Sequence, residues 1–354
     1  MKKFRSQYST EKWILITLHN AISQSQIYPF YFFGEYLRNE FSVEFIEIDL
    51  SAFEATPERQ DDVAAVFFQF WIDKTHDQIE GIVEKIKKSY PHARLIFIDS
   101  FAPADLRYAK VLNPLVDIYI KKSLLKDRSL YGKPTHGDTN LSDWYGQHFH
   151  IKQDISSFDV PDVFLNKLRV GPSFFTAPYL LPTFWGNRNN LGSERRFDLH
   201  VRLGGAGSTG WYERMRQLSI NTVKQITKAS CTSIGNVSKT HYLTEMRKSM
   251  ACFSPFGYGE ICWRDHEAIA FGTVLIKPDM NHLETYPNIY ANDETYIACH
   301  WDFSDLQECL ERLLDDASLR QRVATNAFDI LSNYLTEFNF PKFVHQCAQG
   351  DCVV

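Results

Sequence analysis

The sequence predicts an α/β protein of two Rossmann-like, doubly wound domains that face one another across a cleft. Short apolar runs rich in β-branched and aromatic residues alternate with helical patterns in both halves of the chain. At 354 residues the chain also exceeds the size at which one hydrophobic core usually stops growing. Finally, residues 254–279 read as a glycine-bearing loop, a short helix and a buried strand, the unit that offers a helix N-terminus to a phosphate.

The first half carries the βαβ rhythm of a parallel sheet. Strands are expected at residues 13–18, 43–48, 63–70, 94–98 and 116–120, with helices at about 27–40 and 76–90. Residues 121–190 lose this rhythm and gather Gly, Pro, Ser, Asn and Asp, which indicates a long loop and a linker. We therefore place the first domain at residues 1–188.

The second half resumes the alternation and predicts another doubly wound unit. Strands are expected at 197–203, near 232, at 251–254 and at 273–276, and helices at 212–228, 242–249, around Arg264, at 304–315 and at 317–335. The second domain is placed at residues 189–326, and residues 327–354 form a closing segment with a helical stretch at 327–335.

Composition limits the function. The chain is 44% hydrophobic and 23% charged, as in globular proteins, and its net charge of −5 gives no sign of a general nucleic-acid surface. The seven cysteines are odd in number and lack CxxC spacing, which argues against a zinc site and a disulfide framework and favours the cytoplasm. The apolar run at 13–18 is too short for a signal peptide or a membrane span.

The helix around Arg264 carries the strongest functional signal. Arg264 and Glu267 stand three residues apart and share one helix face, where a cation can meet a diphosphate and a carboxylate can accept hydrogen bonds from sugar hydroxyls. The alternative is an ordinary solvated ion pair of a surface helix. That alternative leaves the preceding glycine-bearing loop and the following buried strand unexplained, so the pattern favours a nucleotide-sugar site.

These residues also carry a resemblance to a family. Residues 197–279 resemble the C-terminal domain of GT-B glycosyltransferases, and Arg264-x-x-Glu267-Ala268 followed by Gly272 is most similar to the exostosin-like branch. In that branch a Ser-Pro-x-Gly loop, which begins here at Ser254, precedes the Arg-x-x-Glu-Ala motif.

The chain departs from the broader GT-B pattern at two places. Many retaining members have seven residues between two glutamates, whereas Glu260 and Glu267 have six between them. The proline that usually follows the glycine is replaced by Thr273. Retaining and inverting chemistry therefore both stay open.

The resemblance implies that the second domain holds a nucleotide-diphosphate sugar, that the first domain holds the acceptor, and that neither a cofactor nor a catalytic metal is needed. It also implies that the closing segment crosses back onto the first domain. The expected donor-binding residues are Arg202, Gly204, Gly205, Ser254, Gly257, Tyr258, Gly259, Glu260, Arg264 and Glu267. Three of them have simpler readings, since Arg202 can be the outward residue of a strand, Tyr258 a packing residue and Glu260 a helix-dipole partner.

A catalytic base is expected on the first domain if the reaction inverts, at the carboxyl ends of the strands. Asp99 and His19 each directly follow an expected strand, and Asp138 lies on the long loop. Each also has a structural reading, because a strand-end Asp often caps a turn or helix and loop residues such as Asp138 often order their own loop.

Three other functions remain open. The loop from Gly205 to Gly210 fits GxGxxG and favours an NAD-dependent oxidoreductase, but residues 230–236, where the ribose-binding acid is expected, contain no Asp or Glu. A sugar-nucleotide epimerase can share the fold and the diphosphate site. A catalytically silent sugar-nucleotide-binding or scaffold protein would lack a competent base.

The acceptor is the least defined partner. Tyr28, Phe32 and Tyr36 form an aromatic stripe on the expected helix at 27–40, which can meet a glycan or a lipid-linked glycan in peripheral contact with a membrane. The helix lacks the basic face of a surface anchor, so burial on both sides is the competing explanation. The sequence thus predicts a cytoplasmic, metal-independent glycosyltransferase acting on a glycan or another hydroxyl acceptor.

Overall fold

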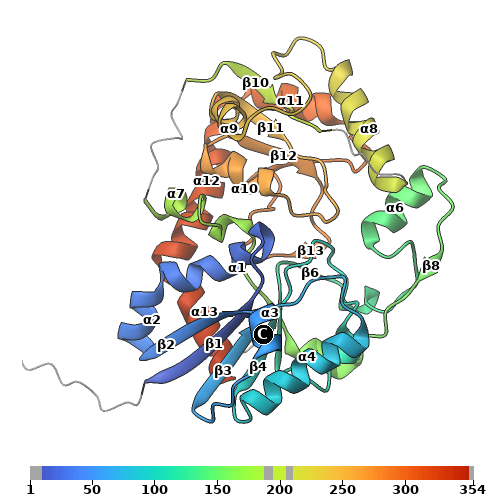
Figure 1. The fold of residues 1–354 in the computed structure, drawn as a ribbon. Helices are drawn as coiled ribbons and strands as arrows, with labels where there is room; N and C mark the ends of the chain where they lie inside the picture. The colour runs from blue at the N-terminus through green and yellow to red at the C-terminus, as the bar shows by residue number, and fades with distance from the viewer. Residues whose placement is uncertain (1–9, 187–193, 205–209, 351–354) are drawn as a thin grey trace, which may run out of the picture.

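The computed structural model describes residues 10–186, 194–204 and 210–350, which form two α/β domains (Figure 1). The first is built on a six-stranded parallel sheet in the order β2-β1-β3-β4-β5-β9. Its strands are β1 (Glu11–Thr17), β2 (Val43–Asp49), β3 (Val63–Phe68), β4 (Arg94–Ile98), β5 (Ile118–Lys121) and β9 (Leu168–Val170). The first five confirm the expected strands, because buried parallel strands have continuous apolar sequences.

Both faces of this sheet are buried. Alternate residues of β1 enter different apolar clusters, with Trp13 and Leu15 in one and Ile14 and Ile16 in the other. The covering helices are α1 (Ala21–Phe32), α2 (Gly34–Phe41), α3 (Leu50–Ala55), α4 (His76–Ser89) and α5 (Ala109–Leu112). The helix expected at 27–40 is divided into α1 and α2. Asn20 caps α1 at an earlier start by accepting a hydrogen bond from the Ser23 amide, and the chain breaks at Phe33.

The described part of the segment 121–190, residues 121–186, contains more secondary structure than the expected loop and linker. It contains β6 (Leu124–Leu125), β7 (Thr135–His136), α6 (Asn140–His148), β8 (Ile155–Ser156), β9 and α7 (Leu181–Gly186), with 3₁₀ helices at Arg128–Leu130, Asp162–Lys167 and Phe174–Thr176. Strands β6, β7, β8 and β9 have only two or three residues each, which is too short to show a hydrophobic period, so the sequence pattern did not predict them.

The second domain has a four-stranded parallel sheet in the order β10-β11-β12-β14. The strands are β10 (Phe197–His200), β11 (Ser249–Phe253), β12 (Val274–Pro278) and β14 (Ile297–Cys299). The helices are α8 (Trp211–Gln225), α9 (Lys239–Arg247), α10 (Trp263–Ala270), α11 (Leu306–Asp315), α12 (Ala317–Thr336) and α13 (Asn339–Gln349). The strand expected near 232 is only a single bridge, between Cys231 and Leu199.

The closing segment returns to the first domain one helix later than expected. Helix α12 runs without a break through residues 326 and 327 and packs on β12 and α10 of the second domain. The chain turns at Phe338 in the left-handed conformation (φ 58°), and α13 then packs on the first domain, with the Phe340 ring 5.1 Å from that of Phe30. The expected domain boundary at residues 188 and 189 lies outside the described residues.

The two domains also touch directly beside the expected cleft. Strand β6 of the first domain pairs antiparallel with β13 (Leu283–Glu284) of the second. Gly259 lies against the backbone of Ala102, and a Cβ atom built on this glycine would be 2.0 Å from the Ala102 carbonyl oxygen. Among the described helices, none combines the length and the apolar sequence needed to cross a membrane.

We predict that Gly259→Ala destabilises the protein by about 1–3 kcal/mol, because the added methyl group forces the two backbones apart. Urea unfolding measures the change. Gly81→Ala is the matched control, since Gly81 lies inside α4 with nothing within 4 Å of its built Cβ and should gain about 0.5–1 kcal/mol. Equal stability of the Gly259→Ala variant and the wild type would contradict the close interdomain contact.

Candidate functional site

The main candidate site is a cavity of about 670 Å³, called here the first cavity, at the carboxyl ends of β10 and β11. Its walls contain Arg202 and Gly204 after β10, and Phe256 and Gly257 after β11. Leu199 of β10 pairs with β11 on one side and with Cys231 on the other, so the chain leaves these two strands in opposite directions. Such a switch point is where open α/β sheets bind their ligands.

The first domain meets this cavity at its own switch point. Strand β1 has β2 on one side and β3 on the other, and Ala21, which begins α1 after β1, lines the cavity. Tyr179, near the start of α7, also lines it. The first cavity therefore lies between the two domains, as the sequence predicts for a cleft.

A buried carboxylate positions the helix that carries Arg264. Asp265, which has no exposed surface, accepts hydrogen bonds from the Cys262 amide (3.0 Å) at the start of α10 and from the Tyr290 hydroxyl (2.8 Å). The ammonium group of Lys277, on β12, lies 3.2 Å from it. The Ser254 hydroxyl donates to the same carboxylate at 2.6 Å and is fully buried. Ser254 therefore supports α10 and does not line the first cavity, where the sequence analysis expected it.

Arg264 lines the first cavity, and its guanidinium contacts the Tyr242 hydroxyl. One terminal nitrogen donates to the backbone carbonyl of Arg202 at 2.9 Å. Its buried Nε has no hydrogen-bond partner among the described residues. Because a buried donor without a partner costs free energy, this nitrogen marks the surroundings of Arg264 as a candidate ligand site.

Glu267 also lines the first cavity and is held by three donors. Its Oε1 accepts from the Tyr179 hydroxyl (2.8 Å) and from Lys239, and its Oε2 accepts from the Tyr242 hydroxyl (2.8 Å). Burial, together with the Glu267 carboxylate, raises the pKa of both phenols, so they stay protonated and act as donors. A carboxylate has about four acceptor positions, so one on Oε2 remains for a ligand hydroxyl.

Two cations of the first cavity were missed by the sequence analysis. Arg216, on α8, donates to the Gly204 carbonyl at 3.4 Å, and its buried Nε has no partner in the described chain. Lys239, at the start of α9, joins Glu267. In the sequence, both resemble ordinary charged residues on the solvent-exposed face of a helix. Their spacing does not distinguish them from such residues.

The expected donor residue Arg202 is committed to a different partner. Its guanidinium forms a bidentate pair with Glu245, with both N–O distances 2.7 Å. Although Arg202 lines the cavity, its charge is neutralised there, and it contributes its carbonyl to Arg264 instead. Gly204 lines the cavity as expected, whereas Gly205 lies outside the described residues.

The glycine-bearing loop before α10 divides between two environments. Gly257 lines the cavity, but Gly259 faces Ala102. Tyr258 is 58% exposed and stacks on Tyr212 with a ring distance of 4.3 Å. Glu260 is fully buried beyond the cavity wall and accepts a hydrogen bond from Asn140 of α6. Of the expected loop residues, Gly257 lines the first cavity, whereas Tyr258, Gly259 and Glu260 do not.

The three expected catalytic residues lie in three different places. Asp99 is fully buried and accepts hydrogen bonds from Tyr119 (2.7 Å) and Lys121. The expectation that it reaches the cleft was therefore wrong. The His19 side chain is 65% exposed, 3.5 Å from Asp49, and is close in sequence to the cavity residue Ala21 without lining the cavity itself.

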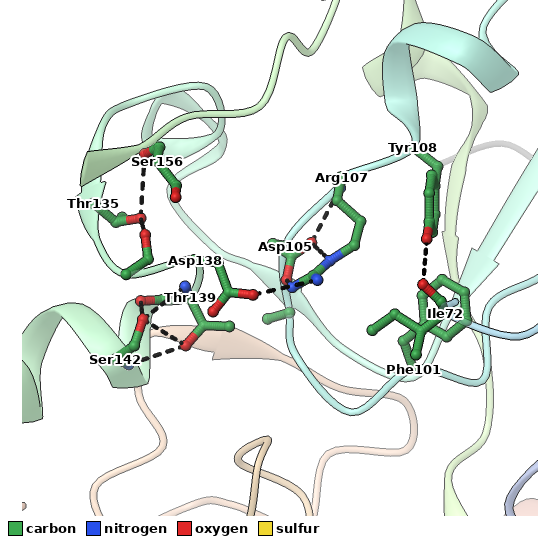
Figure 2. A network of polar contacts seen from close by, with 12 residues as sticks. Ile72, Phe101, Asp105, Arg107, Tyr108, Thr135, Asp138, Thr139, Ser142 and Ser156 are labelled. Carbon is green, nitrogen blue, oxygen red and sulfur yellow. Dashed lines mark hydrogen bonds and ion pairs between the residues drawn. The ribbon is translucent and has the colours of Figure 1, made fainter. Parts of the chain in front are cut away.

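Asp138, the third expected base, lies away from the first cavity. It belongs to a polar network in which its carboxylate approaches Arg107 at 3.4 Å, while Arg107 also pairs with Asp105 (Figure 2). The aromatic stripe of Tyr28, Phe32 and Tyr36 on α1 and α2 is half-buried, and Tyr36 stacks on Phe338 at 4.1 Å. That contact supports packing over acceptor binding for Tyr36.

No family model matches the chain, and no curated protein matches it in sequence. Solved structures do match it. Sucrose-phosphate synthase from Thermosynechococcus elongatus aligns over 96% of this chain and 98% of its own, with 11% identity and a TM-score of 0.54. HepE from Anabaena, crystallised with UDP, aligns over 96% and 100%, with 8% identity and a TM-score of 0.51. A glycosyltransferase from Rickettsia africae aligns over 97% and 99%, with 10% identity and a TM-score of 0.50.

These alignments span both domains of each protein. They show that the chain has the GT-B glycosyltransferase fold, which confirms the fold expected from residues 197–279 and the βαβ rhythm of the first half.

We predict that Asp265→Asn destabilises the protein by about 3–5 kcal/mol, because the buried Lys277 ammonium loses its counter-charge. Urea unfolding measures the effect, and Asp315→Asn on the exposed end of α11 should stay within about 0.5 kcal/mol of the wild type. Adding Lys277→Met to Asp265→Asn should cost less than the sum of the two single changes, since no unpaired charge remains. Strict additivity would show that the two groups do not interact.

Proposed function

We propose that the protein transfers a sugar from a nucleotide-diphosphate sugar to a hydroxyl group of a glycan or other acceptor. The observation that carries the proposal is the convergence of Arg264, Arg216 and Lys239 on the first cavity, with Glu267 among them. A diphosphate is the common biological ligand that calls for several cations, and its sugar offers hydroxyls to a carboxylate. HepE, which has the same fold, was crystallised with UDP, and this supports a uridine nucleotide as the first ligand to test.

In this proposal Arg264 and Arg216, which both line the first cavity, bind the diphosphate through their guanidinium groups. The N-terminus of α10 adds a partial positive charge on the same side, since Arg264 lies in its first turn. Together they stabilise the negative charge that develops on the leaving diphosphate. Glu267 accepts one hydroxyl of the ribose or of the donor sugar with its remaining acceptor position.

The proposal includes transfer without a catalytic metal. The cations that line the first cavity can take over the charge neutralisation that Mg²⁺ performs in other transferases. An NAD-dependent reaction is less well supported, because residues 235–239 contribute Asn236 and Lys239 to the lining but no carboxylate for a ribose. An epimerase would bind the same nucleotide and is separated from a transferase by the product formed.

We predict that Arg264→Ala weakens binding of the preferred nucleoside diphosphate roughly 10- to 100-fold, because a charge-assisted hydrogen bond contributes about 1.5–3 kcal/mol. A thermal-shift screen with UDP, GDP, CDP, dTDP and NAD⁺ identifies the nucleotide, and calorimetry then measures its affinity with and without EDTA. We expect stabilisation by one nucleoside diphosphate and no effect of EDTA.

Arg322→Ala is the matched control, because Arg322 is an exposed residue of α12 far along the chain from the cavity. It should bind the nucleotide as the wild type does. Stabilisation by NAD⁺ alone, or full nucleotide affinity in the Arg264→Ala variant, would overturn the proposed site. Loss of affinity in EDTA would overturn metal independence only.

A further inference from the structure

A second cavity, of about 550 Å³, lies between residues 105–160 of the first domain and the loops that follow β12 and β14. This volume falls within the roughly 300–1,000 Å³ of small-ligand sites. The second cavity shares no lining residue with the first. Asn140, which lines the second cavity, binds the buried Glu260 from the loop that borders the first. The proposed donor site therefore leaves the second cavity unexplained.

Aromatic rings form much of its wall. Tyr131, Trp144, Phe158 and Trp301 all line the cavity. Trp144 stacks on His148 with one face (ring distance 4.8 Å, 12° between planes), and Phe158 has the Arg107 guanidinium 5.2 Å from its ring centre. Trp144 also lies 5.4 Å from Trp301 in a tilted arrangement, and both rings line the cavity. The rings therefore form a joint aromatic wall that a flat ligand can contact.

The polar part of the wall is acidic. Asp105, Asp138, Asp143 and Asp279 line the cavity, against one lysine, Lys133. Figure 2 shows Asp105 and Asp138 approaching Arg107 from two different loops, so part of this negative charge is already compensated. Asp143 is likewise bound to His136, through both the ring nitrogen (3.0 Å) and the backbone amide (2.8 Å).

The charges of the lining residues favour one of three classes of ligand. An anionic ligand is disfavoured, because the four lining aspartates outnumber Lys133 and the neighbouring Arg107. A polyamine requires free carboxylates, but Asp105 and Asp143 already have cationic or donor partners. An uncharged saccharide needs hydrogen-bond acceptors for its hydroxyls and flat ring faces for its C–H surfaces, and the cavity provides both.

We propose that the second cavity is a binding site for an uncharged oligosaccharide, with Trp144 as a stacking platform and Asp138 as a hydroxyl acceptor. Saccharide binding here does not depend on the transferase reaction. Its further assignment as the place where an acceptor glycan is held rests on the proposed function. It then implies that the acceptor is a neutral sugar chain and not an anionic one.

The experiment is saturation-transfer NMR on the full chain with five probes: maltotriose, cellotriose, N,N′,N″-triacetylchitotriose, trigalacturonate and spermine. We expect at least one uncharged trisaccharide to bind with a Kd below about 10 mM, and Trp144→Ala to weaken it roughly tenfold. Asp138→Ala, at a residue whose side chain is 56% exposed, should weaken the same probe without affecting folding.

Two controls separate this site from the proposed donor site. Trp185→Ala, on α7 and remote from the lining, should leave saccharide binding unchanged. Arg264→Ala should weaken nucleotide binding and leave saccharide binding unchanged. Binding of trigalacturonate or spermine without any uncharged trisaccharide would overturn the proposal. So would no binding by any probe, or an unchanged Kd in both the Trp144→Ala and Asp138→Ala variants.

Discussion

The first cavity depends on one buried carboxylate. Asp265 joins three elements: the start of α10 through Cys262, the end of β11 through Ser254, and β12 through Lys277. Each of these contacts is 2.6–3.2 Å long. The position of α10 along the sheet fixes where Arg264 and Glu267 stand, because both extend from the same helix. Moving α10 would separate Asp265 from Lys277 and leave a buried charge without a partner, which is costly. The helix therefore stays in place, and its side chains form a preorganised site for a ligand.

The interface between the domains is the second constraint. Gly259 touches Ala102, β6 pairs with β13, and α13 returns from the second domain to pack on the first. The walls of the first cavity come from both domains, while its cations come from the second. A ligand held by those cations is therefore presented to the carboxyl end of β1.

The sequence predicted the sheets well and the site only in part. Buried parallel strands and amphipathic helices such as α4 have strong periods, whereas β6, β7 and β9 are too short to show one. Arg264 and Glu267 were found because their motif lies between a glycine-bearing loop and a strand. Arg216 was not, because it differs from a solvated helical arginine only in three dimensions.

The failed expectations share a physical cause. Position at a strand end predicts that Asp99 reaches the cleft, yet it does not predict that Lys121 of the neighbouring strand pairs with it. Ser254, Arg202 and Glu260 likewise face partners that are 11 or more residues away in the sequence. Polar residues near a site are thus recognised from sequence, but whether they bind the ligand or position those that do depends on long-range contacts.

The charges of the two cavities argue for a division of ligands between them. The first concentrates Arg264, Arg216 and Lys239, and the second concentrates aspartates around aromatic rings. A charged diphosphate is attracted to the first cavity and repelled from the second. A neutral glycan has no net charge for these groups to attract, so it is bound through stacking and through hydrogen bonds of its hydroxyls. Because the attraction to the first cavity is Coulombic and the stacking in the second is not, rising salt should weaken nucleotide binding far more than saccharide binding. A calorimetric titration of each ligand between low and high NaCl measures the two slopes. Equal slopes would mean that the cavities do not discriminate by charge.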